Sequence, residues 1–387
     1  MKKNRILFVY HRMCIGGSTT SLLSLLHNLD PSKFEIDLLL YEKKGVFLTD
    51  IPKHVNILNQ AKKINLFSLI RFLFNIKTFK AIFCKLFRKN TLYHMQYMGQ
   101  SRVNLCRKIE NKYDIAIGFL ECLPSYYTLS EKINATKKII WIHTDYINAK
   151  FSSKIDEKVF LKANNIVLVS KGCLDSFNSV FKNLTDKTIL IENIFSKKML
   201  KLKSNLYNPQ IKKNDVNFLV VCRMDVKVKA LDRLLEVFRK LINNDITNFH
   251  CSFVGDDVNN EFQKLLTNYS DLCDNISYLG ATSNPYPYFL QADCLLLLSL
   301  YEGKPMVVIE AQLLNLPTLI TNFNSASEIV NNGYDGLIFE NNFDDIYEGL
   351  LYVLKNSYIL GEFKTSLYKK DLSKYMKIES VIEKLNL

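Results

Sequence analysis

Acidic residues are absent from one long stretch of this chain of 387 residues. Between Asp50 and Glu110 there is no Asp or Glu, while the same interval holds twelve Lys and Arg. At the average frequency of 38 acids in 387 residues, about six would be expected over those 59 positions. The whole chain carries a net charge of +13. A stretch that carries only cations predicts contact with an anionic partner, either a membrane surface or a nucleic acid.

The chain also lacks paired cysteines and long apolar runs. Its nine cysteines include no Cys-x-x-Cys pair and no Cys/His cluster, so we expect reduced thiols, a cytosolic chain and no structural metal. No stretch reaches eighteen uninterrupted apolar residues, so no membrane-spanning helix is expected. The basic start, Met1 to Arg5, precedes an apolar run, Ile6–Tyr10, that is too short for a signal peptide.

Strand-like and helix-like segments alternate through the first half, as in a doubly wound α/β domain. A helix is predicted over Ser18–Leu29, where Ser18 would cap the helix start. The predicted strands are short apolar runs: Arg5–Tyr10, Phe34–Tyr41, Asp114–Phe119, Lys138–Ile142 and Asn165–Ser170. This half, residues 1–195, is predicted to be one domain.

The polar stretch Ser196–Asn214 is predicted to be a linker, after which the alternation starts again. A helix is predicted over Leu231–Ile242. The predicted strands of this half are Val216–Cys222, His250–Val254, Asn275–Leu279, Cys294–Leu298 and Thr318–Thr321. Residues 215–370 therefore form a second predicted domain, and 372–387 a C-terminal helix.

Within the acid-free stretch, residues 64–87 show helical periodicity. The repeating apolar positions are Leu69, Phe72, Ile76, Phe79, Phe83 and Leu86, and the opposite face is basic. Part of the apolar face is expected to pack on the first domain. The prediction is reversible attachment of 51–109 to an anionic membrane without insertion. A solvated helix face is the alternative, and no RRM, zinc-finger or helix-turn-helix signature supports nucleic-acid binding.

The most informative motif is Ser299-Leu-Tyr-Glu302-Gly-Lys-Pro305, followed by Glu310. Pro305 suits the first turn of a helix, so Glu302 would lie in the loop before the free N–H groups of that helix. A helix start binds anions, so two carboxylates beside it suggest a ligand with both phosphate and hydroxyl groups. A sugar nucleotide has both.

This motif resembles the donor-binding segment of the retaining glycosyltransferases of family 4, which have the GT-B fold. The resemblance covers most of the chain. It implies two Rossmann-like domains facing across a cleft, with the C-terminal helix 372–387 packing back on the first domain. It also implies that Glu302 contacts the transferred sugar and that Glu310 binds the nucleotide ribose.

Other matches to the family pattern extend the expected donor site. Arg223 and Lys229 match the pair that binds the diphosphate, although Ala230 replaces the usual Gly and Lys227 is a rival. The further donor-binding residues implied by the resemblance are Gly16 and Gly17, Gly255 with Asp257 in place of a second Gly, and Ser299, Gly303, Lys304, Pro305 and Met306. In the first domain, His143 matches the histidine near the reacting sugar, and Glu121 is a second candidate.

The sequence therefore predicts a retaining hexosyltransferase-like enzyme of the bacterial surface-polysaccharide type. It would use a nucleotide sugar and a glycan or lipid-linked glycan acceptor, without a cofactor or metal, at the inner face of the cell membrane. An epimerase on the same fold, a nucleic-acid-binding protein and a silent membrane-attached module are the alternatives. The sugar, base, acceptor and linkage are not encoded in these motifs.

Overall fold

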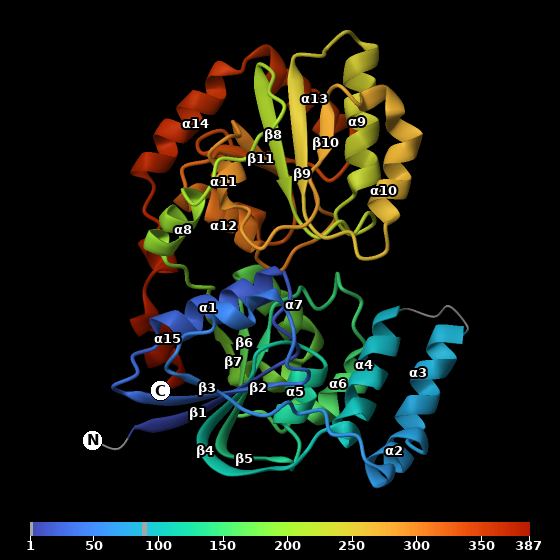
Figure 1. Ribbon diagram of the computed structural model, residues 1–387, viewed down its shortest axis with the longest axis vertical. Helices are drawn as coiled ribbons and strands as arrows, with labels where there is room; N and C mark the ends of the chain where they lie inside the picture. The colour runs from blue at the N-terminus through green and yellow to red at the C-terminus, as the bar shows by residue number, and fades with distance from the viewer. Residues whose placement is uncertain (1–2, 87–90) are drawn as a thin grey trace. The chain divides into compact units, whose positions relative to one another are not determined.

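The computed structural model describes residues 3–86 and 91–387, which form two compact units (Figure 1). The first unit contains the residues up to Cys14, Ser18–Ile194 and Lys377–Leu387. The second contains Ile15–Gly17 and Phe195–Met376. Each unit is built around one parallel sheet, so the expected α/β class with two Rossmann-like domains is confirmed.

The sheet of the first unit has seven parallel strands in the order β3-β2-β1-β4-β5-β6-β7. Its strands are β1 (Asn4–Tyr10), β2 (Phe34–Leu40), β3 (Val55–Ile57), β4 (Ile109–Gly118), β5 (Ile133–Ile142), β6 (Asn165–Leu168) and β7 (Thr188–Leu190). Its helices are α1 (Gly17–Asn28), α2 (Leu66–Leu73), α3 (Ile76–Leu86), α4 (Thr91–Arg102), α5 (Leu123–Thr128), α6 (Ser153–Phe160), α7 (Lys171–Val180) and α15 (Ile378–Leu385). The short edge strands β3 and β7 were not predicted.

The sheet of the second unit has six parallel strands in the order β10-β9-β8-β11-β12-β13. Its strands are β8 (Val216–Val221), β9 (Phe249–Val254), β10 (Ile276–Tyr278), β11 (Cys294–Leu297), β12 (Thr318–Thr321) and β13 (Gly336–Phe339). Its helices are α8 (Lys197–Ser204), α9 (Leu231–Asn243), α10 (Glu261–Leu266), α11 (Tyr286–Phe289), α12 (Met306–Leu313), α13 (Phe343–Lys355) and α14 (Tyr358–Lys369). Helix α8 lies inside the segment predicted as a linker.

Both sheets are buried on their two faces, which explains the continuous apolar runs in the sequence. In β1, Ile6 and Phe8 belong to one apolar core of the first unit, and Leu7 and Val9 belong to another. Successive side chains of a strand point to opposite faces, so the two cores lie on opposite sides of the sheet. Helices cover both sides, as in doubly wound folds.

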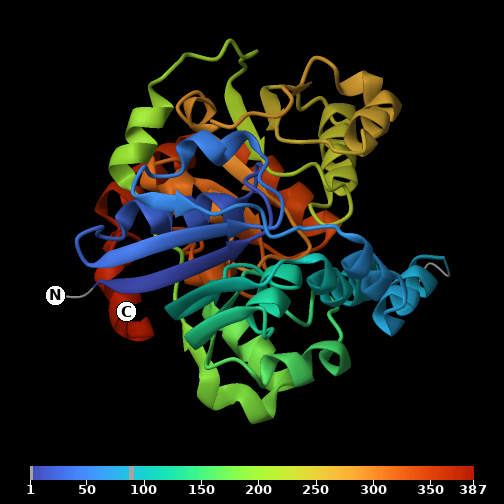
Figure 2. The ribbon, with the colours of Figure 1, turned by 60° about the horizontal axis from the view of Figure 1, so that its bottom comes forward.

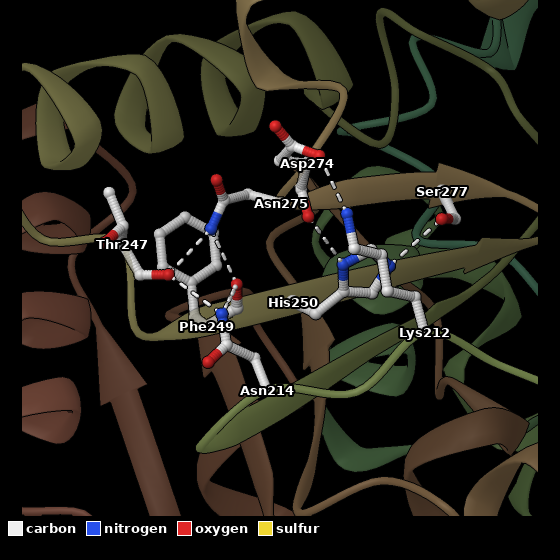
Figure 3. Close-up of polar contacts among 8 residues, drawn as sticks. All are labelled: Lys212, Asn214, Thr247, Phe249, His250, Asp274, Asn275 and Ser277. Atoms are coloured by element: carbon white, nitrogen blue, oxygen red, sulfur yellow. Dashed lines mark hydrogen bonds and ion pairs between the residues drawn. The ribbon is translucent and has the colours of Figure 1, made fainter.

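A network of hydrogen bonds links the amino ends of β9 and β10 in the second unit (Figure 3). His250 bonds the Asp274 carbonyl through Nδ1 at 3.2 Å and the Ser277 hydroxyl through Nε2 at 3.0 Å. The Asn275 amide donates to the carbonyls of Thr247 and Phe249. This network lies at the end of the sheet opposite the predicted donor residues, and it gives His250 a structural role.

The predicted helical segment 64–87 is two helices, α2 and α3, which separate at Phe74 and Asn75. Helix α2 begins with a capping box: Ser68 N–H donates to the Asn65 side chain at 2.8 Å, and Asn65 N–H donates to Ser68 Oγ at 2.9 Å. The Asn75 side chain then accepts the Lys77 N–H at 2.8 Å as α3 starts. In Figures 1 and 2, α2 and α3 lie beyond α4 at one edge of the first unit.

Candidate functional site

The strand order of the second unit defines where a ligand would bind. From β8 the chain continues to β9 on one side, whereas β11, on the other side of β8, continues to β12. The order reverses between β8 and β11, and open α/β sheets bind ligands beyond the carboxyl ends of the strands at such a point. Arg223 follows β8, and Ser299 follows β11. The sheet therefore brings these two predicted site residues to the same location.

Three predicted residues form one hydrogen-bonded cluster at this point. The same oxygen of Glu302, Oε1, accepts a hydrogen bond from Ser299 Oγ at 2.7 Å and from Lys229 Nζ at 2.5 Å. Burial by itself lowers the pKa of Lys229, but the Glu302 carboxylate outweighs burial and holds that pKa above its ordinary value. The cluster thus keeps a cation and a carboxylate, both largely shielded, side by side at the strand ends.

The backbone that carries this cluster is fixed by hydrogen bonds from neighbouring elements. Thr321, the last residue of β12, donates its hydroxyl to the Ser299 carbonyl at 2.6 Å. Arg233 of α9 donates to the Leu298 carbonyl at 2.8 Å. The loop after β11 is therefore held in place from both sides, which suits a site that must position a ligand.

The structure of the loop between β8 and α9 shows which of the two candidate lysines, Lys227 or Lys229, lies at the site. Lys229 reaches Glu302, whereas Lys227 is exposed at the surface. The side chain of Arg223 is 67% exposed and pairs with Asp225 at 3.1 Å. Ala230, where the family has Gly, has φ +47° and lies at the start of α9. Lys229 is the better placed lysine of the two, and Arg223 has room to turn toward a ligand.

Glu310 lies on α12, one residue beyond the first turn of that helix, and is buried. Its carboxylate accepts a hydrogen bond from Tyr286 Oη of α11 at 3.0 Å. Burial raises the pKa of Glu310 to about 7, while Tyr286 and the charge of Lys203 act in the opposite direction. Tyr286 was missed by the sequence analysis because nothing in its local sequence marks it as a partner of a glutamate 24 positions later.

The remaining motif residues lie around the start of α12. Pro305 is the N-cap residue, Met306 is the first helical residue, and Gly303 is buried in the loop. The Lys304 side chain is fully buried, with Nζ 3.6 Å from Glu328 and 5.3 Å from the centre of the Tyr375 ring. Lys304 thus points into the body of the unit and is less accessible to a phosphate than Arg223.

Gly255 allows the ends of β8 and β9 to approach each other closely. A Cβ added at Gly255 would lie 1.6 Å from the carbonyl oxygen of Cys222, so no other residue fits without a backbone shift. Its N–H donates to the Gly280 carbonyl at 2.9 Å. Asp257, where the family has a second Gly, accepts the N–H groups of Phe262 and Gln263 and so holds the start of α10.

In the first unit, His143 and Glu121 lie together at the carboxyl ends of β5 and β4. The backbone N–H of His143 and the hydroxyl of Thr144 donate to the two Glu121 oxygens, at 3.2 Å and 2.8 Å. The His143 ring packs against Phe119, with ring centres 4.9 Å apart. Burial lowers the pKa of His143 to about 3, so the imidazole is neutral at physiological pH. Its buried Nε2 has no hydrogen-bond partner within the described part of the chain.

The glycine pair lies at the start of α1, which begins at Gly17. A Cβ added at Gly16 would meet no described atom within 4 Å, so local packing does not require glycine there. Ser18 lies inside the helix, not at its cap as predicted, and its hydroxyl bonds Tyr10 Oη at 2.7 Å. Among the residues that the structure describes, no three His, Cys, Asp or Glu side chains are grouped to hold a metal ion.

Comparison with known proteins supports this view of the second unit. Residues 204–374 match the family model described as glycosyl transferases group 1, a range that contains the Glu302 cluster and Glu310. An uncharacterized glycosyltransferase of Methanocaldococcus jannaschii is 29% identical over 203 residues, 49% of this chain and 48% of that protein. The chain thus spans about half the length of this curated relative.

A second relative matches over a shorter range. The Escherichia coli UDP-Gal:alpha-D-GlcNAc-diphosphoundecaprenol alpha-1,3-galactosyltransferase is 38% identical over 72 residues, 18% of this chain and 19% of that protein. Among solved structures, Anabaena HepE in complex with UDP-glucose superimposes with a TM-score of 0.69 and 13% identity, covering 99% of this chain and 98% of that chain. The chain therefore has the GT-B fold.

Proposed function

We propose that this protein is a glycosyltransferase that moves a sugar from a nucleotide diphosphate donor to an acceptor hydroxyl. The observation that carries the proposal is the cluster of Ser299, Glu302 and Lys229 beside the buried Glu310 helix, at the point where the strand order reverses. A nucleotide sugar needs cations for its diphosphate and carboxylates for its hydroxyl groups, and this location offers both.

The roles follow from the charge and position of each side chain. Glu310 accepts hydrogen bonds from the ribose hydroxyls, and Glu302 accepts them from the transferred sugar. Arg223 and Lys229 neutralise the charge that grows on the departing diphosphate, and the free N–H groups at the start of α12 add a positive potential. No covalent nucleophile is assigned, and transfer with retention of anomeric configuration remains part of the proposal.

The first unit would bind the acceptor. His143 is held neutral by burial, so it can exchange hydrogen bonds with a sugar hydroxyl but carries no positive charge at physiological pH. Glu121 lies beside it and is the nearest candidate to receive a proton. Gly16 and Gly17 belong to the donor side of the proposal, where glycine lets the backbone approach the diphosphate closely.

We also propose that the reaction needs no metal ion and takes place at the inner face of a bacterial cell membrane, on a glycan or lipid-linked glycan used in surface-polysaccharide assembly. The name of the Escherichia coli relative, which specifies a lipid diphosphate acceptor, supports this acceptor class. No helix in the described residues is long and apolar enough to span a bilayer.

The test is to incubate the purified chain with UDP-, GDP- and ADP-sugars and to follow the sugar by NMR, with and without membrane lipid extract as acceptor. Transfer predicts lipid-dependent release of nucleoside diphosphate and an anomeric configuration equal to that of the donor. Conversion of the sugar to its epimer without transfer would support the epimerase alternative. Activity lost in EDTA and restored by magnesium or manganese would refute the metal-free mechanism.

A further inference from the structure

Helices α2 and α3 present an apolar face to the outside of the first unit. Helix α2 has no buried residue at all. Phe74 is 78% exposed, Leu66 is 76% exposed and Ile76 is 67% exposed. We call this surface the α2–α3 apolar face; its exposed members are Leu66, Phe67, Leu69, Ile70, Leu73, Phe74, Ile76, Phe79, Ile82, Phe83 and Leu86. Contiguous exposed apolar surface of this kind marks an interaction site.

The side of α3 that packs on the protein is made of small and polar residues. The buried residues of α3 are Thr78, Ala81 and Cys84. Thr78 Oγ1 bonds the Ser101 hydroxyl of α4, and His94 Nδ1 bonds the Ala81 carbonyl at 2.8 Å. Of the predicted apolar stripe, Phe72 is partly covered, whereas Ile76, Phe79 and Leu86 are exposed because α3 is anchored through its other side.

Cations border the apolar face, and the stretch 51–109 that carries it contains no acid. At 3.6 residues per turn, Lys80 and Lys85 lie on either side of the apolar stripe of α3. On α2 the Arg71 guanidinium lies over the Phe67 ring, 4.5 Å from its centre. Residues 51–109 contain no Asp or Glu, so no acid of this stretch neutralises them. Arg88 and Lys89, also part of the predicted basic surface, lie outside the described residues.

Two occupants could cover such a face, a second copy of the chain or a lipid surface. A symmetric dimer through this face would bring Arg71, Lys80 and Lys85 of the two copies together without an acid from the same stretch. An anionic bilayer offers negative headgroups for the bordering cations and an acyl region for the apolar side chains between them. The charge pattern therefore favours the lipid surface.

We propose that α2 and α3 insert their apolar face into the interfacial layer of an anionic membrane, with Arg71, Lys80 and Lys85 at the headgroups. Long cationic side chains can reach the headgroups while their helix lies deeper. Arg71, Lys80 and Lys85 could therefore stay at the headgroups while the apolar side chains enter the acyl region. The inference deepens the proposed function by fixing how the enzyme is held at its lipid-linked acceptor. It also changes the sequence-based prediction, which was surface attachment without insertion.

A tryptophan reporter tests insertion directly. The chain has one tryptophan, Trp141, which is buried and so gives a constant background. Phe79→Trp places a reporter on the apolar face, and Tyr368→Trp, at an exposed position of α14, is the matched control. With vesicles of phosphatidylglycerol and acyl-brominated phosphatidylcholine, the emission of Phe79→Trp should shift to the blue and be quenched. That of Tyr368→Trp should not change.

A triple substitution, Phe67→Ser, Phe74→Ser and Phe79→Ser, tests how much the apolar face contributes to membrane affinity. Burying one phenylalanine is worth at least about tenfold in partitioning, so the triple variant should bind these vesicles about a thousandfold more weakly or worse. Its thermal unfolding should match wild type because the three side chains are exposed. Binding to anionic vesicles without quenching of the Phe79→Trp reporter, or with unchanged affinity in the triple variant, would overturn insertion.

Self-association is the other outcome that would overturn the proposal. If sedimentation shows a wild-type dimer that the triple variant loses, a second copy covers the face. None of these measurements uses a donor or an acceptor. A protein that inserts but transfers no sugar would therefore refute the proposed function and leave this inference standing, and the reverse result would do the opposite.

Discussion

Glu310 is buried, and the role proposed for it, binding the ribose hydroxyls, needs a charged carboxylate. A carboxylate binds two ribose hydroxyls well only when it is ionised, yet burial raises its pKa to about 7. We therefore expect the KM for the donor to fall as the pH rises from about 6 to about 8. In Glu310→Gln this pH dependence should disappear, with a loss of binding of about 1–3 kcal/mol at high pH. Steady-state kinetics across this range measures both effects.

Tyr286 provides the control for that experiment. Its hydroxyl lowers the pKa of Glu310, so Tyr286→Phe should move the midpoint of the profile to higher pH. A residue with only a packing role would reduce activity equally at every pH. The raised pKa also lowers stability as the pH increases through 7, since the folded state holds a proton that the unfolded chain releases near 4.5. Glu310→Gln should remove that decline.

Ala230 is strained where the family has glycine. Its φ of +47° lies in the left-handed region, which costs a residue with a Cβ about 1–2 kcal/mol. Ala230→Gly should therefore raise the free energy of unfolding and with it the midpoint of thermal unfolding. The net gain in free energy is at most about 1 kcal/mol, because glycine also increases the conformational entropy of the unfolded chain. Calorimetry measures this shift. An unchanged or lower midpoint would show that the surroundings already relieve the strain.

Among the elements, the loop between β8 and α9 carries Arg223 and Lys229, the two cations that we propose bind the diphosphate. Arg223→Ala should weaken binding of a nucleoside diphosphate much more than binding of the nucleoside, since charge neutralisation of this kind contributes about 3–4 kcal/mol. Lys227→Ala is the matched control, because Lys227 is exposed and has no link to Glu302. Calorimetric titration of both ligands separates the roles; equal losses for nucleoside and diphosphate would indicate a folding defect.

Sequence reasoning succeeded for elements whose signal is local. The loop and helix start between Ser299 and Glu310 could be predicted because Pro305 and the preceding apolar strand fix where the helix begins. The exposure of the α2–α3 apolar face could not be predicted, because periodicity shows that a helix is amphipathic but not which of its sides packs on the protein. Only the contacts of Thr78 and Ala81 with α4 show that the small residues face inward.

Across the whole molecule, the alternation of apolar strands and amphipathic helices was enough to predict two doubly wound units. The edge strands β3 and β13 were not predicted, although β10 and β12, which are as short, were. The partnership of Tyr286 with Glu310, and that of Lys229 with Glu302, depends on long-range packing. The sequence could propose the site residues singly, but their mutual contacts required the fold.

The central claim, that the strand-end cluster of the second unit binds a nucleotide diphosphate sugar, is tested most directly by a thermal-shift screen. Wild-type protein is measured with nucleotides and nucleotide sugars, beside Glu302→Gln and the control Lys227→Ala. A ligand at one hundred times its dissociation constant should stabilise the wild type and Lys227→Ala by about 2.7 kcal/mol, and Glu302→Gln by clearly less. No stabilisation of the wild type by any nucleotide sugar, or equal stabilisation of all three proteins, would contradict the account.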